Sequence, residues 1–121
     1  MLIKKINLKP YTDTQSDHTV EVLEYGKLDK GMDIAVSTMT GVYPGKDKWS
    51  MNTEVETMTY FVLSGSAIFY FKDEDSYKIE EGDCVFIEKN KKYRVEIPEG
   101  KTLSVLMASN PAWNPDQYII E

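Results

Sequence analysis

The chain has 121 residues, of which 41% are hydrophobic and 28% charged, a composition ordinary for one soluble globular domain with a real core. The formal net charge of −6 excludes nucleic acid and anionic membranes as favoured partners, because both need a positive surface. Neither a signal peptide nor an apolar run of about 20 residues is visible. We therefore expect a single cytoplasmic domain over residues 1–121.

The N-terminal part predicts extended structure interrupted by a polar turn. Residues 2–8 are expected to be extended, residues 11–17 to form a turn, and residues 19–25 to form a β-strand. His18 is the chain's single histidine and ends a polar run. A histidine acts as an acid or base only where geometry supports it, so we expect His18 to lie at the surface.

Residues 32–43 alternate in polarity and predict a long strand with two half-buried faces, closed by Pro44 and Gly45. From Asn52 a second alternating run begins, and side chains two apart in a strand point to the same face. We take one face of this run as the wall of a pocket. It carries Asn52, Glu54, Glu56, Met58 and Tyr60.

The rest of the chain predicts short strands separated by tight turns, at residues 67–71, 77–79, 93–97 and 102–108. Cys84 lies in a β-like segment with no second cysteine, and we expect a buried structural thiol. Trp113 is expected to anchor an irregular C-terminal tail. Because no segment shows a helical period, the fold class is all-β, a sandwich or small barrel.

Two glycines anchor spaced motifs in this region. Gly65 ends the segment Asn52-x-Glu54-x3-Met58-x6-Gly65, and Gly82 begins the segment Gly82-x5-Glu88-x-Asn90-x2-Tyr93-x3-Ile97. In spacing and in their pattern of hydrophobic and turn residues, they resemble the two motifs of the cupin superfamily, G-x5-H-x-H-x3-E-x6-G and G-x5-P-x-G-x2-H-x3-N. The positions that hold metal ligands in such cupins carry other residues here: Asn52, Glu54, Met58 and Tyr93.

The resemblance covers residues 32–113 and implies a small β-barrel, the double-stranded β-helix or jelly roll of RmlC-like cupins, with strands from residues 1–30 completing the sheets. Because the histidine ligands are replaced, we expect neither a conventional metal centre nor another cofactor. Asn52, Glu54 and Glu56 leave open a hard cation bound by oxygen atoms.

The predicted ligand-binding residues are Asn52, Glu54, Glu56, Met58, Tyr60 and Tyr93, and they include no lysine or arginine. A buried anion there would lack a counter-charge, so we expect a neutral or cationic polar ligand, such as a carbohydrate-like molecule. The first alternative is a metal-independent isomerase, epimerase or lyase, with Glu54 as base and Tyr93 as acid. The second is a ligand-sensing or interaction module.

Apolar residues on both faces of several strands exceed what one small barrel needs to bury. A two-fold partner would cover them. We therefore expect a homodimer.

Overall fold

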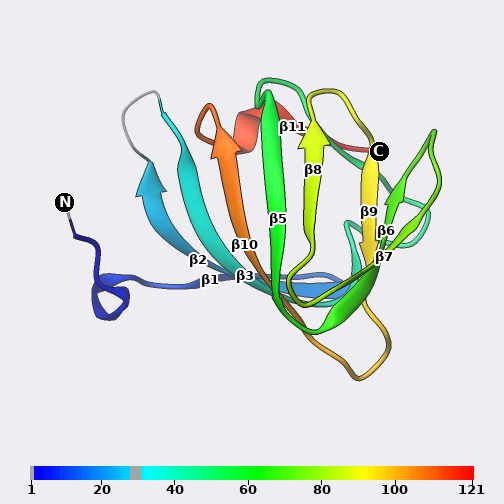
Figure 1. The fold of residues 1–121 in the computed structure, drawn as a ribbon, viewed down its shortest axis with the longest axis horizontal. Coiled ribbons are helices and arrows are strands. Elements are labelled where there is room, and N and C mark those ends of the chain that lie inside the picture. Colours follow the sequence, from blue (N-terminus) through cyan, green and yellow to red (C-terminus); the bar gives the residue numbers. More distant parts are fainter. Residues whose placement is uncertain (1, 28–30) are drawn as a thin grey trace.

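A computed structural model describes residues 2–27 and 31–121, and β-strands dominate it (Figure 1). The strands are β1 (Tyr11–Thr14), β2 (His18–Lys27), β3 (Asp33–Tyr43), β4 (Ser50–Asn52), β5 (Thr57–Ser64), β6 (Ser66–Phe71), β7 (Tyr77–Glu80), β8 (Cys84–Glu88), β9 (Tyr93–Glu96), β10 (Leu103–Asn110) and β11 (Tyr118–Ile120). Two short 3-10 helices are also present, η1 (Lys5–Asn7) and η2 (Pro115–Gln117). In the described residues, no helix has the length and apolar character that crossing a membrane requires.

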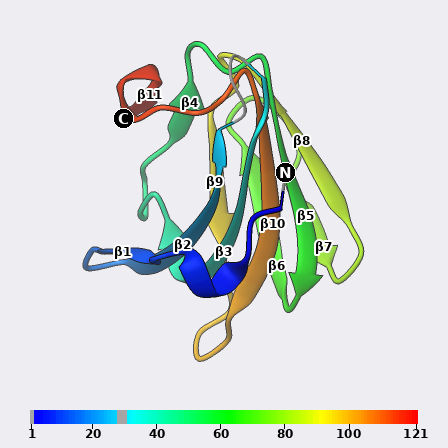
Figure 2. The ribbon, with the colours of Figure 1, turned by 90° about the vertical axis from the view of Figure 1, so that its left-hand side faces the viewer.

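The strands form two layers that share β3. One layer has the order β1-β2-β3-β10-β5-β8, and the other contains β7-β6-β9 with β4 and β11. The last two residues of β3, Val42 and Tyr43, leave the first layer and pair with β9. Seen from the side, β4 and β11 lie on one flank of the molecule and β5 and β8 on the other (Figure 2). The expected all-β jelly roll is confirmed.

The period of two along β3 decides which side chains face the interior. Ala35, Ser37 and Met39 share one face and are buried, whereas the residues between them are only partly buried or exposed. Apolar side chains from both layers meet them and close the core. Those with no exposed surface are Val55, Val62, Phe69, Ile87, Val95, Leu103 and Val105.

Three local predictions are wrong. The segment expected to be extended contains η1, and the segment expected to be a turn contains the strand β1. Cys84 is exposed rather than buried, because in β8 Val85 and Ile87 point inward and the residues between them point outward. β1 formed because it pairs with β2 over four positions, a contact that the local sequence does not encode.

The outer face of the first layer carries a continuous apolar row across five strands. The register aligns Leu23, Val36, Leu106, Phe61 and Cys84 side by side. A neighbouring row brings Ile34 and Phe86 to the same face. The residues Phe61 and Phe86 are 40% and 65% exposed, so this face leaves large apolar groups in water.

Gly41 lets the start of β2 pack directly on β3. It has a φ of +82°, and a Cβ there would lie 2.0 Å from the carbonyl oxygen of Asp17 and 2.8 Å from the Cα of His18. The next residue donates its N–H to the same Asp17 oxygen, at 2.9 Å. Only glycine fits this contact without displacing the backbone. The position of His18 therefore depends on Gly41.

Replacing Gly41 with Ala should lower the free energy of unfolding by about 3 kcal/mol or more, since both backbone strain and a backbone clash are introduced. Gly82→Ala is the matched control, because Gly82 has a φ of +88° but nothing within 4 Å of the added Cβ. It should lose only about 1–2 kcal/mol. Urea unfolding measures the loss of stability in both variants. Equal losses would show that the contact between position 41 and the backbone of Asp17 is not tight.

Candidate functional site

A cavity of about 530 Å³ lies between the two layers. Its walls come from side chains of β1, β2, β3, β5, β9, β10 and the C-terminal segment. Two chemically different ends can be distinguished. One is built around His18 and tyrosines, and the other around the carboxylates of Glu24 and Asp33.

His18 lies inside the barrel, not at the surface, so that prediction is wrong. Its residue is 5% exposed and lines the cavity. The Nε2 atom lies 3.7 Å from Oδ2 of Asp13, which is within ion-pair distance but too long for a hydrogen bond. Neither ring nitrogen has a hydrogen-bond partner in the described structure, and the ring packs edge-on against Tyr43 at 5.4 Å.

The polar residues around His18 suggested a surface position, but the glycine at position 41 is a sequence signal that could have indicated burial. Gly41 interrupts the alternation of a predicted strand, and an isolated glycine there often marks a close approach of another backbone. His18 is the residue opposite Gly41 in the β2–β3 register. Asp13 reaches the same place because β1 pairs with β2, placing Asp13 opposite Val20.

Three tyrosines stand next to His18 and form the aromatic end of the cavity. The ring centroids of Tyr60 and Tyr93 are 6.1 Å apart in an edge-on arrangement, and those of Tyr43 and Tyr93 are 6.5 Å apart. Phe69 stacks under Tyr93 at 5.5 Å. The hydroxyl groups are linked, because Tyr93 is hydrogen-bonded to Tyr60 and to Ser50, and Ser50 is also hydrogen-bonded to Tyr43.

Burial raises the pKa of all three phenols, so they are protonated donors at neutral pH. The pKa values of Tyr43 and Tyr60 are raised well above the ordinary value, first by burial and then by the neighbouring Tyr93. Burial also raises the pKa of Tyr93, but hydrogen bonds from Tyr60 and Ser50 oppose that effect. Tyr93 is therefore the phenol best suited to release a proton.

Of the residues predicted to bind a ligand, Met58, Tyr60 and Tyr93 line the cavity. Asn52 is buried beside it, but its amide has other partners. The Asn52 Oδ1 atom accepts from Nε2 of Gln117 at 3.0 Å, and its Nδ2 donates to the sulfur of Met58 at 3.8 Å. The binding roles of Met58, Tyr60 and Tyr93 stay predictions.

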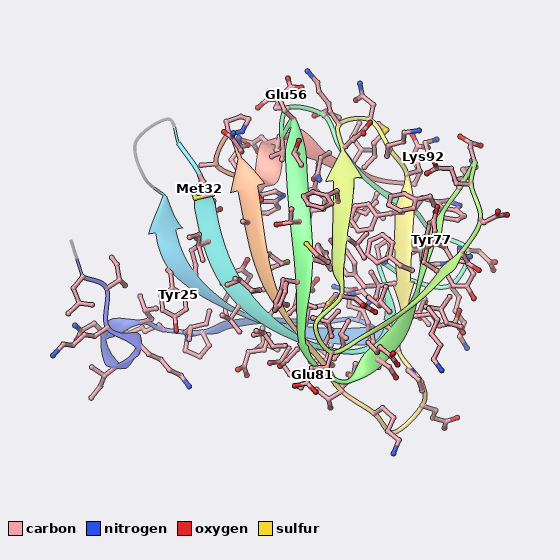
Figure 3. The ribbon with its side chains drawn as sticks, viewed as in Figure 1. Tyr25, Met32, Glu56, Tyr77, Glu81 and Lys92 are labelled. Atoms are coloured by element: carbon pink, nitrogen blue, oxygen red, sulfur yellow. The ribbon has the colours of Figure 1, made fainter. Side chains whose placement is uncertain are left out.

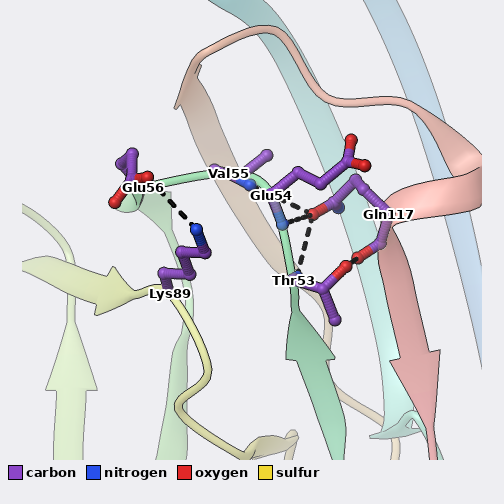
Figure 4. Close-up of polar contacts among 6 residues, drawn as sticks. All are labelled: Thr53, Glu54, Val55, Glu56, Lys89 and Gln117. Carbon is purple, nitrogen blue, oxygen red and sulfur yellow. Dashed lines mark hydrogen bonds and ion pairs between the residues drawn. The ribbon is translucent and has the colours of Figure 1, made fainter.

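Glu54 and Glu56 do not face the cavity, so the predicted placement of these two carboxylates is wrong. Both are exposed, and Glu56 lies at the rim of the barrel, where it pairs with Lys89 at 3.3 Å (Figures 3 and 4). The alternation fails because the chain leaves the sheet between β4 and β5. Gln117 causes the bend: its Oε1 accepts the N–H groups of residues 53, 54 and 55 at 3.2–3.3 Å (Figure 4).

The residues at the four cupin metal positions do not fit a transition-metal ion. The amide of Asn52 is occupied, Glu54 points outward, Met58 offers a thioether, and the Tyr93 phenol has a raised pKa. In residues 2–27 and 31–121, no group of three or more histidine, cysteine, aspartate or glutamate side chains is arranged to hold a metal. Glu54 and Glu56 also cannot combine with Asn52, because they lie outside the barrel.

Charged groups in the cavity wall are mainly acidic. Asp13, Glu24 and Asp33 line it, together with Lys48 from the loop after β3. Lys48 is thus one loop lysine that reaches the cavity. Among the described residues, Lys89 and Lys92 instead pair with surface carboxylates. The expectation of a neutral or cationic ligand therefore stays a prediction.

The buried phenols predict a loss of stability in alkali. Their pKa values are higher in the folded than in the unfolded chain, so the unfolded chain releases protons that the folded protein keeps. The contribution of the phenols to the free energy of unfolding should be constant below pH about 10 and fall above it, by up to about 1.4 kcal/mol per pH unit for each phenol. Tyr60→Phe should make the decline shallower. Urea unfolding from pH about 8 to about 11 tests this, and a flat profile would contradict it.

Comparison with known proteins gives a family and several structural relatives. The cupin-domain family model matches residues 39–109, and no curated protein sequence matches the chain. Streptomyces Pac13, described as a nucleoside dehydratase and solved with uridine, is 14% identical with a TM-score of 0.79; 100% of this chain and 89% of Pac13 are covered.

Two further solved structures have the same fold. A predicted oxalate decarboxylase from Thermotoga maritima is 16% identical with a TM-score of 0.73, covering 92% of this chain and 99% of that one. Ectoine synthase from P. lautus is 8% identical with a TM-score of 0.65, covering 91% of this chain and 80% of that one. At these identities the structures show the fold alone. The family model spans more than half of the chain, which therefore belongs to the cupin superfamily.

Proposed function

We propose that this cupin binds a small polar molecule in the barrel and acts on it by metal-independent proton transfer. His18 is the general base, Asp13 is its charge partner, and Tyr93 is the general acid. The reaction class is an elimination or isomerisation, in which a carbon-bound proton moves to His18 while the phenol protonates the departing or rearranging oxygen.

One observation carries the proposal. His18 is buried in the cavity wall, and both its ring nitrogens lack hydrogen-bond partners in the described structure. Leaving buried polar atoms unsatisfied costs about 1–3 kcal/mol each, so a ligand that bonds them would remove the cost. A purely structural histidine would instead be expected to hold a backbone or side-chain partner.

Asp13 and Tyr93 suit the other two roles. A carboxylate 3.7 Å from Nε2 stabilises the imidazolium that forms when His18 takes a proton. Tyr93 is protonated, faces the cavity and receives hydrogen bonds that stabilise its ionised form. The predicted pair of Glu54 and Tyr93 is thus replaced by His18 and Tyr93, since Glu54 lies outside the barrel.

The fold relatives support a neutral or cationic substrate. Pac13 is described as a nucleoside dehydratase and binds uridine, an uncharged molecule, on the same fold. The acidic wall of this cavity points the same way. A ligand-sensing module is the second candidate. It is favoured because the rings of Tyr60 and Tyr93 pack against Phe69, so that these residues resemble a filled core rather than catalytic groups.

The test begins with a thermal-shift screen of nucleosides, uncharged sugars, amines and their phosphorylated counterparts. Ligands that raise the melting temperature are then incubated in D2O, and proton NMR follows deuterium entering a carbon-bound position. We expect His18→Gln to slow this exchange by about 10²–10⁴-fold, with binding changed only slightly. Dialysis against EDTA should leave the rate unchanged.

Tyr93→Phe should slow the elimination or isomerisation, whereas Tyr77→Phe is the control, because Tyr77 is exposed on β7 outside the cavity. Binding without exchange, unaffected by His18→Gln, would favour the sensing module. A requirement for a metal ion would contradict the proposal, as would larger shifts with the phosphorylated compounds.

We also propose that the protein is a homodimer, with the apolar outer rows of β2, β3, β10, β5 and β8 as the interface. Light scattering during gel filtration should give twice the chain mass of 13.9 kDa. Phe86→Glu should yield a monomer, since a charge would be buried in the interface. Tyr77→Glu, an equally drastic change on exposed β7, should remain dimeric. A monomeric unmodified protein at micromolar concentration would contradict this.

A further inference from the structure

Residues 2–9 form an N-terminal arm that leaves the barrel beyond the β2 edge of the first layer (Figure 1). Residues 2–7 are all exposed, and the exposed fractions of Leu2, Ile3 and Ile6 are 77%, 39% and 87%. Within the described residues, the backbone hydrogen bonds of the arm stay inside the arm. A terminal segment that nothing ties down is disordered in water, so an ordered arm with these side chains needs a surface to pack on.

An apolar surface of the same kind lies at the opposite edge of the first layer. Phe86 of β8 is 65% exposed, the highest exposed fraction among the large apolar residues of the described strands. Cys84 and Glu88, two residues away on either side, point to the same outer face. The arm and β8 therefore each present apolar side chains that their own chain does not cover.

The charges of the two surfaces are opposite. The arm contains three lysines and no acidic residue, in a chain whose formal net charge is −6. Phe86 lies between two exposed carboxylates, Glu88 on its own strand and Glu81 in the turn before β8 (Figure 3). Within residues 2–27 and 31–121, neither these two carboxylates nor the lysines of the arm take part in an ion pair. Complementary charge of this kind selects and orients a partner.

A two-fold axis parallel to the strands would bring the arm of one copy to β8 of another. The apolar row runs across the layer from Leu23 of β2 to Cys84 of β8. When two copies pack these rows face to face around that axis, the β2 edge of each meets the β8 edge of the other. The arm leaves the barrel near the level at which β8 begins (Figure 1). An axis along the rows would instead bring both lysine-rich arms to one edge, where they would repel each other.

We propose that the N-terminal arm docks on β8 of a second copy of this chain, with its apolar side chains covering Phe86 and its lysines facing Glu81 and Glu88. The inference rests on the proposed homodimer and adds an exchange of arms to it. Each arm continues directly into β1, which contributes Asp13 to the cavity. The second copy thus holds β1 from its N-terminal side and keeps Asp13 beside His18, so that association completes the site.

His18 reports on this coupling without any ligand. It is the chain's single histidine, so its Cε1 proton gives one assignable NMR signal. The Nε2 atom lies 3.7 Å from Oδ2 of Asp13 and the ring packs edge-on against Tyr43, so the chemical shift responds to both neighbours. Release of the arm loosens β1 and moves Asp13. Dilution of the unmodified protein at constant pH should therefore shift the His18 signal as the dimer dissociates.

Ile6→Ser and Asn7→Ser form a matched pair of variants, because both residues are exposed in η1 but only the first change removes an apolar side chain. Analytical ultracentrifugation of the full chain should show that Ile6→Ser raises the dissociation constant of the dimer about tenfold or more, since two isoleucines per dimer stay in water. Asn7→Ser should leave the constant unchanged. At a concentration where the unmodified protein is dimeric, Ile6→Ser should move the His18 signal toward its position in the diluted protein.

Disulfide cross-linking tests which surface the arm reaches. The arm and the exposed Cys84 lie at opposite edges of the layer, so a disulfide between positions 6 and 84 joins two chains. A chain carrying Ile6→Cys and Cys84→Ser is mixed with the unmodified chain and oxidised with oxidised glutathione. Mass spectrometry should find a covalent dimer joined through positions 6 and 84. Tyr77→Cys with Cys84→Ser is the control, because Tyr77 is exposed on β7 of the other layer and should not form the link.

Three results would overturn the inference: equally tight dimers of Ile6→Ser and Asn7→Ser, a link at position 6 no stronger than that at position 77, or a His18 signal that stays in place as the dimer dissociates. A dimer that Phe86→Glu disrupts and Ile6→Ser does not would reject the arm and keep the proposed homodimer. A monomeric unmodified chain would reject both. The proposed catalysis is judged separately, by deuterium exchange in His18→Gln.

Discussion

The side-chain amide of Gln117 holds the barrel in the form that the cavity requires. Its Oε1 accepts hydrogen bonds from three consecutive backbone N–H groups between β4 and β5, and its Nε2 donates a hydrogen bond to Oδ1 of Asn52. Gln117 has no exposed surface, so these bonds form away from competing water. They join the C-terminal segment to the barrel and so place Trp113 and Tyr118 beside the cavity, where their rings pack at 5.2 Å.

The same amide explains why the protein departs from metal-binding cupins. Asn52 stands where a histidine ligand would be, but its side-chain amide is hydrogen-bonded to Gln117 and to the sulfur of Met58. The carboxylates and the histidine that line the cavity come instead from β1, β2 and the start of β3, towards the β1 edge of the first layer. Of the four positions that hold metal ligands in such cupins, Met58 and Tyr93 still line the cavity, whereas Asn52 and Glu54 do not.

The sequence predicts much of the fold and part of the site. The period of two placed Met58 and Tyr60 inward correctly, because strand geometry is local. It failed at Glu54, because the bend depends on Gln117, 63 residues further on in the chain. His18 was missed since its burial depends on Gly41 in another strand, and Asp13 since β1 depends on pairing with β2. In each case a long-range contact overrode the local pattern.

β1 supplies both Tyr11 and Asp13 to the cavity, yet in the described part of the chain it pairs with β2 alone and its residues are exposed. A strand held along one edge opens at a lower free energy than the central strands do. Ligand contacts with Tyr11 and Asp13 would therefore order this strand, and occupancy of the cavity and protection of the β1 amides from hydrogen exchange would be two measures of a single equilibrium. Part of the intrinsic affinity of such a ligand would then be used to order β1, and the measured affinity would depend on how firmly the free protein already holds this strand.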